Sequence, residues 1–307
     1  MHIGAPAKPI VAAGDNVKLG QLVAKASGFV SANIHASVSG KVERIERRYL
    51  PNGGITECLV IRNDGLDTFS DEIDSSGSLE NLTAEKIRSL LQEKGIVGMG
   101  GAAFPTHVKY APPKDGPGID TVIINGIECE PFVTADHRVL LEKPKEVIRG
   151  LKYFLLASGA ARGVIAIEDN KPDAISLLTE LTENESNIEV VTCQEKYPQG
   201  SEKQLIYAVT GRIVPERALP ASVGVIVDNV STAVQTALAV ETGLPCYERV
   251  LTVNGDAVAR PGNYLVRIGS LYSDVVTLAC GGTKAHVAKI LCGGPMMGFA
   301  VSSLEYS

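Results

Sequence analysis

Apolar residues recur with two alternating periods through the middle of the chain, and this pattern predicts a layered α/β domain. Helical patterns alternate with short apolar runs of strand length. The first helix is expected after Thr83, which can cap it, and Gly95 can close it. Further helices are expected at about 143–159, 172–183, 202–210 and 230–242, and strands at 121–124, 163–167 and 188–193. Such alternation is typical of a largely parallel sheet.

The two ends of the chain carry the turn-rich pattern of small β domains. Residues 1–65 hold short apolar pairs between glycine turns, and an acidic, serine-rich stretch over 66–82 indicates a linker. After a central domain over 83–245, residues 246–307 predict a β-grasp-like unit. Its elements are expected as strands over 249–256 and 261–269, a helix near 271–279 and a final strand near 287–292.

Composition and charge exclude several classes of protein. The net charge of −6 and the lack of a basic run argue against nucleic acid as a partner. No stretch of eighteen apolar residues is present to span a membrane, and the N-terminus lacks the regions of a signal peptide, so a cytoplasmic location is expected. The six cysteines include no Cys-x-x-Cys pair, so the usual zinc and iron–sulfur signatures are absent and reduced thiols are expected.

Two other kinds of site are not supported by the residues. His107, His137, Asp136 and Cys129 lack the spacing of a known metal-ligand set, so no metal site is predicted. Cys129 is also a poor nucleophile, because a carboxylate on each side raises the pKa of its thiol.

The stretch from Gly95 to Lys109 is the strongest local candidate for a binding site. Its glycines at 98, 100 and 101 permit close approach of a ligand to the backbone, and Pro105 suits the first turn of a following helix. A loop that leads into a helix N-terminus attracts anions, and Lys109 would add a positive charge. A simple glycine turn remains the alternative. The stretch follows a helix and matches neither a Walker A loop nor a Rossmann fingerprint, which disfavours an ordinary doubly wound nucleotide site.

Polar residues follow the predicted strand at 121–124 and begin two later helices. Glu128 and Glu130 alternate, so on extended backbone they would share a face opposite Cys129 and suit hydroxyls, a ribose or a ring N–H. A solvated turn explains them equally well. Ser201 with Glu202, and Asn229 with Ser231, are typical helix starts, and several helix N-termini can converge on one anion.

In this order, the segments resemble the RnfC subunit of the Rnf-type electron-transport complex across essentially the whole chain. Residues 1–65 resemble the barrel-sandwich hybrid of biotinyl and lipoyl carriers, without their modifiable lysine. Residues 83–298 more distantly resemble the NADH-binding flavoprotein subunit of respiratory complex I, ending in its soluble-ligand-binding β-grasp domain (SLBB). The motifs that carry the resemblance are GMGGAAFPT at 98–106 with Lys109, NGIECEP at 125–131 with DHR at 136–138, YPQGSEKQL at 197–205 and GGPMMG at 293–298.

The resemblance implies an FMN held by the glycine stretch, with NADH bound over its ring and no side chain acting as acid or base. The residues implied in cofactor binding are Gly98, Gly100, Gly101, Ala102, Phe104, Lys109, Asn125, Glu128, Glu130, Gly200, Glu202, Asp228 and Asn229. The implied activity is that of an NADH dehydrogenase module, peripheral on the cytoplasmic side of the membrane, whose partners are NADH, the other proteins of the complex and, indirectly, ferredoxin.

The chain also departs from the family pattern. The family usually has glycine at Ala103 and Ser201, and it continues into a ferredoxin-like domain whose cysteine runs hold [4Fe-4S] clusters, so a fragment or trimmed chain is expected. Two alternatives remain open from the sequence. One is a cobalamin reductase of a propanediol-utilising microcompartment, and the other is a docking scaffold that has lost its flavin.

Overall fold

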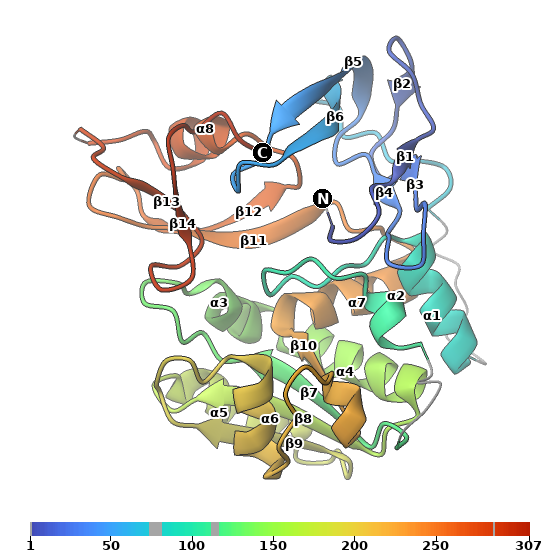
Figure 1. The fold of residues 1–307 in the computed structure, drawn as a ribbon, viewed down its shortest axis with the longest axis vertical. Coiled ribbons are helices and arrows are strands. Elements are labelled where there is room, and N and C mark those ends of the chain that lie inside the picture. Colours follow the sequence, from blue (N-terminus) through green and yellow to red (C-terminus); the bar gives the residue numbers. More distant parts are fainter. Residues whose placement is uncertain (1, 74–81, 112–116, 285) are drawn as a thin grey trace.

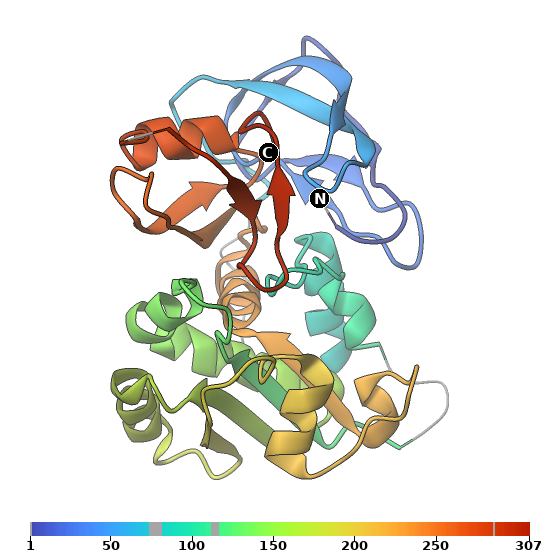
Figure 2. The ribbon, with the colours of Figure 1, turned by 60° about the vertical axis from the view of Figure 1, so that its left-hand side comes forward.

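A computed structural model describes residues 2–73, 82–111, 117–284 and 286–307, which form three parts. The N-terminal β module and the C-terminal domain lie side by side on one side of the central α/β domain (Figure 1). The turned view in Figure 2 shows the same arrangement. An ion pair of 2.9 Å between Arg267 and Asp67 joins the C-terminal domain to the chain that follows the N-terminal module.

The N-terminal module is a barrel-sandwich of two antiparallel sheets, as the sequence predicts. The sheets have the orders β1-β3-β4 and β2-β5-β6, and Val17, Val23 and Val42 are buried between them. Their strands are β1 (Lys8–Pro9), β2 (Asn16–Val17), β3 (Leu22–Lys25), β4 (Ile34–His35), β5 (Gly40–Tyr49) and β6 (Ile55–Asn63).

The segment predicted as a linker is in part packed on this module. Leu19 pairs with Phe69, and the amide of Ser70 donates to the carbonyl of Leu19 at 2.8 Å. The later part of the segment, residues 74–81, lies outside the described residues.

The central domain is built on a four-stranded parallel sheet of order β10-β7-β8-β9, which confirms the predicted sheet. Successive residues point to opposite faces, so Ile124 of β7 enters one core and Ile123 the other. Both faces are covered by helices, which explains the continuous apolar runs of the strands. The strands are β7 (Thr121–Gly126), β8 (Arg162–Glu168), β9 (Ile188–Cys193) and β10 (Val225–Asn229).

Helices α1, α4, α5 and α7 pack on one face of this sheet and α6 on the other. The predicted cap of α1 is confirmed, because the side chain of Thr83 accepts from the amide of Lys86. Helix α3 was not predicted. The helices are α1 (Ala84–Glu93), α2 (Thr106–Lys109), α3 (Ala135–Glu142), α4 (Pro144–Ser158), α5 (Pro172–Thr182), α6 (Glu202–Thr210), the 3-10 turn η1 (Pro220–Val223) and α7 (Val230–Thr242).

The C-terminal domain consists of two hairpins around a short helical segment. Strands β11 (Glu248–Val253) and β12 (Gly262–Arg267) form the first hairpin, and β13 (Ile290–Cys292) and β14 (Phe299–Val301) form the second. The helix predicted near 271–279 is α8 (Tyr272–Asp274) followed by a π-helical turn, η2 (Val275–Ala279). Strand β14 was not predicted.

Within the described ranges, none of the helices combines the length and the apolar character needed to cross a membrane.

Candidate functional site

The candidate residues gather where the order of strands reverses. Strands β7 and β10 are neighbours, with Asn125 paired to Asn229 at their carboxyl ends, while β8 and β9 follow on the other side of β7. The connections from β7 and β10 therefore leave in opposite directions, which opens a ligand position at the carboxyl edge of such sheets. The glycine stretch predicted as an anion site lies at this edge.

The glycine stretch forms a closed loop between α1 and α2. Its base is held by bonds from the amide of Gly98 to the carbonyl of Phe104 (2.8 Å) and from Thr106 to Ile96 (3.0 Å). At its centre, the amide of Met99 donates to the hydroxyl of Thr232 in α7 at 2.9 Å. The loop is therefore anchored to the helix that follows β10.

Two glycines of the loop are required by geometry. A Cβ on Gly100 would lie 3.3 Å from the Cβ of Asn229, and Gly101 has a φ of +118°, which side chains rarely adopt. Gly100, Gly101 and Ala102 are exposed. Among the described residues, no group accepts a hydrogen bond from their amides, so these donors are free for an anion.

The sequence expectation for the following helix was wrong in part. Helix α2 has only four residues, and Pro105 precedes it as its cap instead of lying in its first turn. A single turn has a small dipole, so the loop amides are the main anion donors.

Ala103 is the strained residue of the loop. Its φ is +49°, in the left-handed region, and its carbonyl accepts from the amide of Ile3 at 3.2 Å. This conformation gives a physical reason for the glycine that related sequences usually have there.

Replacing Ala103 with glycine should stabilise the protein by about 0.5–1 kcal/mol, because relief of the left-handed strain exceeds the entropy cost of glycine. Urea unfolding measures the change. Ala102→Gly is the matched control, since Ala102 has no positive φ, and it should not stabilise. Equal gains from both variants would contradict the strain argument.

Lys109 lies in an acidic cluster beneath β10. Its ammonium is 3.4 Å from Glu202 and 3.5 Å from Asp228, and it also donates to the carbonyl of Val227. Burial opposes its charge, but the two carboxylates prevail and raise the pKa of Lys109 above its ordinary value. Tyr110 donates to Asp228 at 2.6 Å. The three predicted residues do come together, and here the lysine joins α2, α6 and β10.

Asn125 and Gly200 bring two loops together. The side-chain amide of Asn125 donates to the carbonyl of Gly200 at 2.9 Å, and the amide of Gly200 donates to the Sγ of Cys129 at 3.4 Å. A Cβ on Gly200 would lie only 2.9 Å from the carbonyl oxygen of Ile127. Glycine is therefore needed for the loop before α6 to reach the loop after β7.

Glu128 and Glu130 do not share a face, so that prediction was wrong. The chain leaves its extended conformation after β7, and the two carboxylates bind different elements. Glu128 accepts from the amides of Asp136 (2.7 Å) and His137 (3.0 Å) in the first turn of α3. Glu130 accepts from the amides of Met296 and Met297, each at 2.8 Å, in the turn between β13 and β14.

Asp136 connects this acidic group to the glycine loop. Its carboxyl accepts from the side-chain amide of Asn229 at 2.6 Å, and Asn229 lies against Gly100. Burial, reinforced by the charge of Glu128, raises the pKa of Asp136 to about 7. Burial likewise raises the pKa of Glu128 above its usual range.

The raised pKa of Asp136 should make stability fall as the pH rises from about 4 to 7. In that window the folded carboxyl holds a proton that the unfolded chain, with a pKa near 3.9, has released. Asp136→Asn should therefore gain at least about 1 kcal/mol relative to the native chain between pH 5 and pH 8, since one pKa unit corresponds to about 1.4 kcal/mol. Urea unfolding at both pH values measures this difference. A constant difference across the window would contradict a raised pKa.

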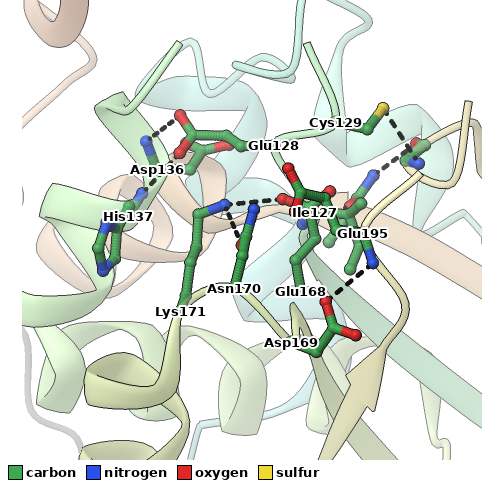
Figure 3. A network of polar contacts seen from close by, with 12 residues as sticks. Ile127, Glu128, Cys129, Asp136, His137, Glu168, Asp169, Asn170, Lys171 and Glu195 are labelled. Carbon is green, nitrogen blue, oxygen red and sulfur yellow. Dashed lines mark hydrogen bonds and ion pairs between the residues drawn. The ribbon is translucent and has the colours of Figure 1, made fainter. Parts of the chain in front are cut away.

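Two functional side chains were not found from the sequence. Glu168 at the end of β8 is fully buried and pairs with the nearly buried Lys171 at 2.7 Å (Figure 3). Its Oε1 has no hydrogen-bond partner within the described part of the chain. Arg249 of β11 donates to the carbonyl of Met99 at 3.2 Å, so the C-terminal domain also contacts the glycine loop. The only available signal was the position of Glu168 after a buried strand.

Over residues 2–73, 82–111, 117–284 and 286–307, no group of three His, Cys, Asp or Glu side chains is arranged to hold a metal ion.

Three family models match the chain in the order of its three parts. They are described as the RnfC barrel sandwich hybrid domain (residues 1–66), the Nuo51 FMN-binding domain (residues 91–237) and the SLBB domain (residues 250–300). An NAD+-reducing [NiFe]-hydrogenase crystal structure shares the fold, with a TM-score of 0.61 over 69% of this chain and 41% of that chain, at 24% identity.

Curated relatives, all of them RnfC-type proteins, cover almost the whole chain. It is 49% identical to that of the Na(+)-translocating ferredoxin:NAD(+) oxidoreductase complex of Acetobacterium woodii, over 97% of this chain and 67% of that protein. It is 46% identical to the proton-translocating counterpart of Clostridium ljungdahlii, over 99% of this chain and 66% of that protein. It is 41% identical to the relative from the ion-translocating oxidoreductase complex of Rhodobacter capsulatus, over 98% of this chain and 58% of that protein.

The chain thus spans about three fifths to two thirds of the length of these relatives. The identities and the three domain matches together show that this chain belongs to the RnfC family of ion-translocating ferredoxin:NAD(+) oxidoreductase complexes.

Proposed function

We propose that this chain is the NADH-oxidising, FMN-binding part of an RnfC protein. The observation that carries the proposal is the glycine loop, whose exposed amides at Gly100, Gly101 and Ala102 have no acceptor in the described ranges. The loop lies at the point where the strand order reverses, which is where open α/β sheets bind nucleotides.

The residues present fit FMN. The loop has room above Gly101, because a Cβ there would meet no atom within 4 Å, and its free amides suit a phosphate. Asn229 and Glu202 begin α7 and α6 at the same edge and supply polar groups for ribityl hydroxyls. Phe104, half-buried at the base of the loop, supplies an aromatic face.

The bound flavin supplies a hydride acceptor, and the task of this chain is positioning. Gly100 and Gly101 hold the phosphate through backbone donors, and Asn229 fixes the loop through its contact with Gly100. Asp136 in turn fixes Asn229. No side chain needs to give or take a proton for hydride transfer from a nicotinamide to a flavin.

The partners follow from the relatives by analogy. These belong to complexes that use ferredoxin and NAD(+), so we propose NADH, the other proteins of the complex and, indirectly, ferredoxin as partners. Iron–sulfur clusters would lie outside this chain, and its place would be on the cytoplasmic side of the membrane. The relatives translocate different ions, so membership alone does not select Na⁺ or H⁺.

The test is reconstitution with FMN followed by anaerobic addition of NADH, which should bleach the flavin band at about 450 nm. Calorimetric titration with FMN should show saturable binding, and Gly101→Val should weaken it at least tenfold without loss of stability, because the loop is exposed. Saturable FMN binding without bleaching at millimolar NADH would refute the NADH step. No saturable heat with FMN would instead favour the flavin-free scaffold.

A further inference from the structure

Three large apolar side chains are exposed together where the central and C-terminal domains meet. Phe132, on the loop between β7 and α3, is 72% exposed, and Met296 and Met297, on the turn between β13 and β14, are 53% and 76% exposed. Glu130, two residues from Phe132, accepts hydrogen bonds from the amides of both methionines. We call these three side chains the apolar platform. Figure 2 shows its β13–β14 turn, in red, reaching toward the central domain.

The backbone beneath the platform is fixed although its side chains are open to solvent. The carbonyl of Phe132 accepts from the side-chain amide of Asn254 at 3.3 Å. The methionine turn is closed by a bond of 2.7 Å from the amide of Gly298 to the carbonyl of Gly294. Gly294 lies so close to Glu130 that a Cβ would come within 2.4 Å of its carboxylate. A rigid backbone under exposed apolar groups is typical of a prepared binding surface.

Phe132 is also strained. Its φ of +67° lies in the left-handed region, where a bulky residue is an outlier, and the exposed ring gains no burial in return. Such strain persists at ligand sites, where binding uses the strained residue. The ring is therefore expected to gain its contacts from a ligand.

The charges around the platform select the kind of ligand. Glu128 and Glu130 flank Cys129 on the same loop, and Asp136 lies within the first turn of α3. These carboxylates repel phosphates but favour a cationic ring, which the nicotinamide of NAD+ provides. Methionine sulfur and the phenylalanine face both suit contact with a flat aromatic ring.

We propose that the apolar platform receives the nicotinamide riboside end of NAD(H), with Phe132 as a specificity-determining residue. This inference rests on the proposed function. It leaves the phosphates of both nucleotides to the glycine loop, at the other side of the carboxyl edge. Glu130 is then a positioning residue that acts through the methionine turn and does not contact the nucleotide by its own carboxylate.

The test is calorimetric titration of FMN-loaded protein with NAD+, NADH and ADP-ribose, which lacks the nicotinamide. Phe132→Gly should weaken binding of NAD+ and NADH at least tenfold, leave ADP-ribose binding within twofold and leave the melting temperature unchanged or higher, since it relieves strain. Met297→Ala should weaken NAD+ binding severalfold and leave folding intact, because this side chain is 76% exposed.

Arg217→Gly is the matched control. Arg217 also has a positive φ, of +62°, but its side chain is almost fully exposed on the loop before η1. It should retain the affinities of the native chain. Unchanged NAD+ affinity in Phe132→Gly, or an equal loss of ADP-ribose affinity, would overturn the inference. Failure of the native chain to bind NAD(H) would instead refute the proposed function.

Discussion

Replacing Lys171 with methionine should destabilise the protein by about 3–5 kcal/mol near neutral pH, because it leaves a buried carboxylate without its counterion. Glu168 is fully buried, and Lys171 is the cation that pairs with it at 2.7 Å. Methionine fills a similar volume, so the loss measures charge and hydrogen bonding more than packing. The free energy of urea unfolding is the measurement, and the loss should shrink in acid, where the carboxylate is protonated.

Two controls define this result. The pair between Lys152 and Glu185 is solvent-exposed, so Lys152→Met should cost at most about 1 kcal/mol. The double variant Glu168→Gln with Lys171→Met should recover much of the loss, since it removes both charges. A loss below about 1 kcal/mol for Lys171→Met alone would show that the pair contributes no more than a surface contact.

Gly150→Ala should destabilise the protein by about 3 kcal/mol, although alanine is the better helix former by about 1 kcal/mol. Gly150 lies where α4 crosses α7, and a Cβ there would come within 2.0 Å of the carbonyl oxygen of Ala233. Backbone cannot yield as a flexible side chain does, so the two helices would have to separate. Thermal unfolding should show a large fall in melting temperature.

Gly118→Ala is the matched control for this steric argument. Gly118 has no positive φ, and a Cβ on it would meet no atom within 4 Å. It should change stability by less than about 0.5 kcal/mol, as surface substitutions usually do. A similar loss in both variants would point to glycine chemistry in general instead of the helix crossing.

The sequence predicted the central domain well because its signals are local. Strand β8 and helix α7 follow from continuous apolar runs and from helical spacing, which need no knowledge of the partner. The convergence of Asn125 and Asn229 could be anticipated too, since both follow buried strands of one parallel sheet. Helix α3 escaped because it is short and mostly polar.

The partners of individual polar side chains could not be predicted, because they are set by chain segments far apart. Glu130 binds amides 166 and 167 positions later, and no pattern around it indicates that contact. Glu168 and Lys171 look like an ordinary surface pair at helical spacing, and only burial distinguishes them. The left-handed conformations of Ala103 and Phe132 are likewise invisible in the residue types.

The glycine loop is held from both outer domains, by Ile3 on the carbonyl of Ala103 and by Arg249 on the carbonyl of Met99. The three domains are therefore not interchangeable cassettes. A chimera that takes its first or last domain from a relative would also take over that domain's hold on the loop. Exchange of whole domains should therefore change cofactor affinity even when every loop residue is kept, and compatible chimeras would have to carry the contacting residues along as one heritable unit.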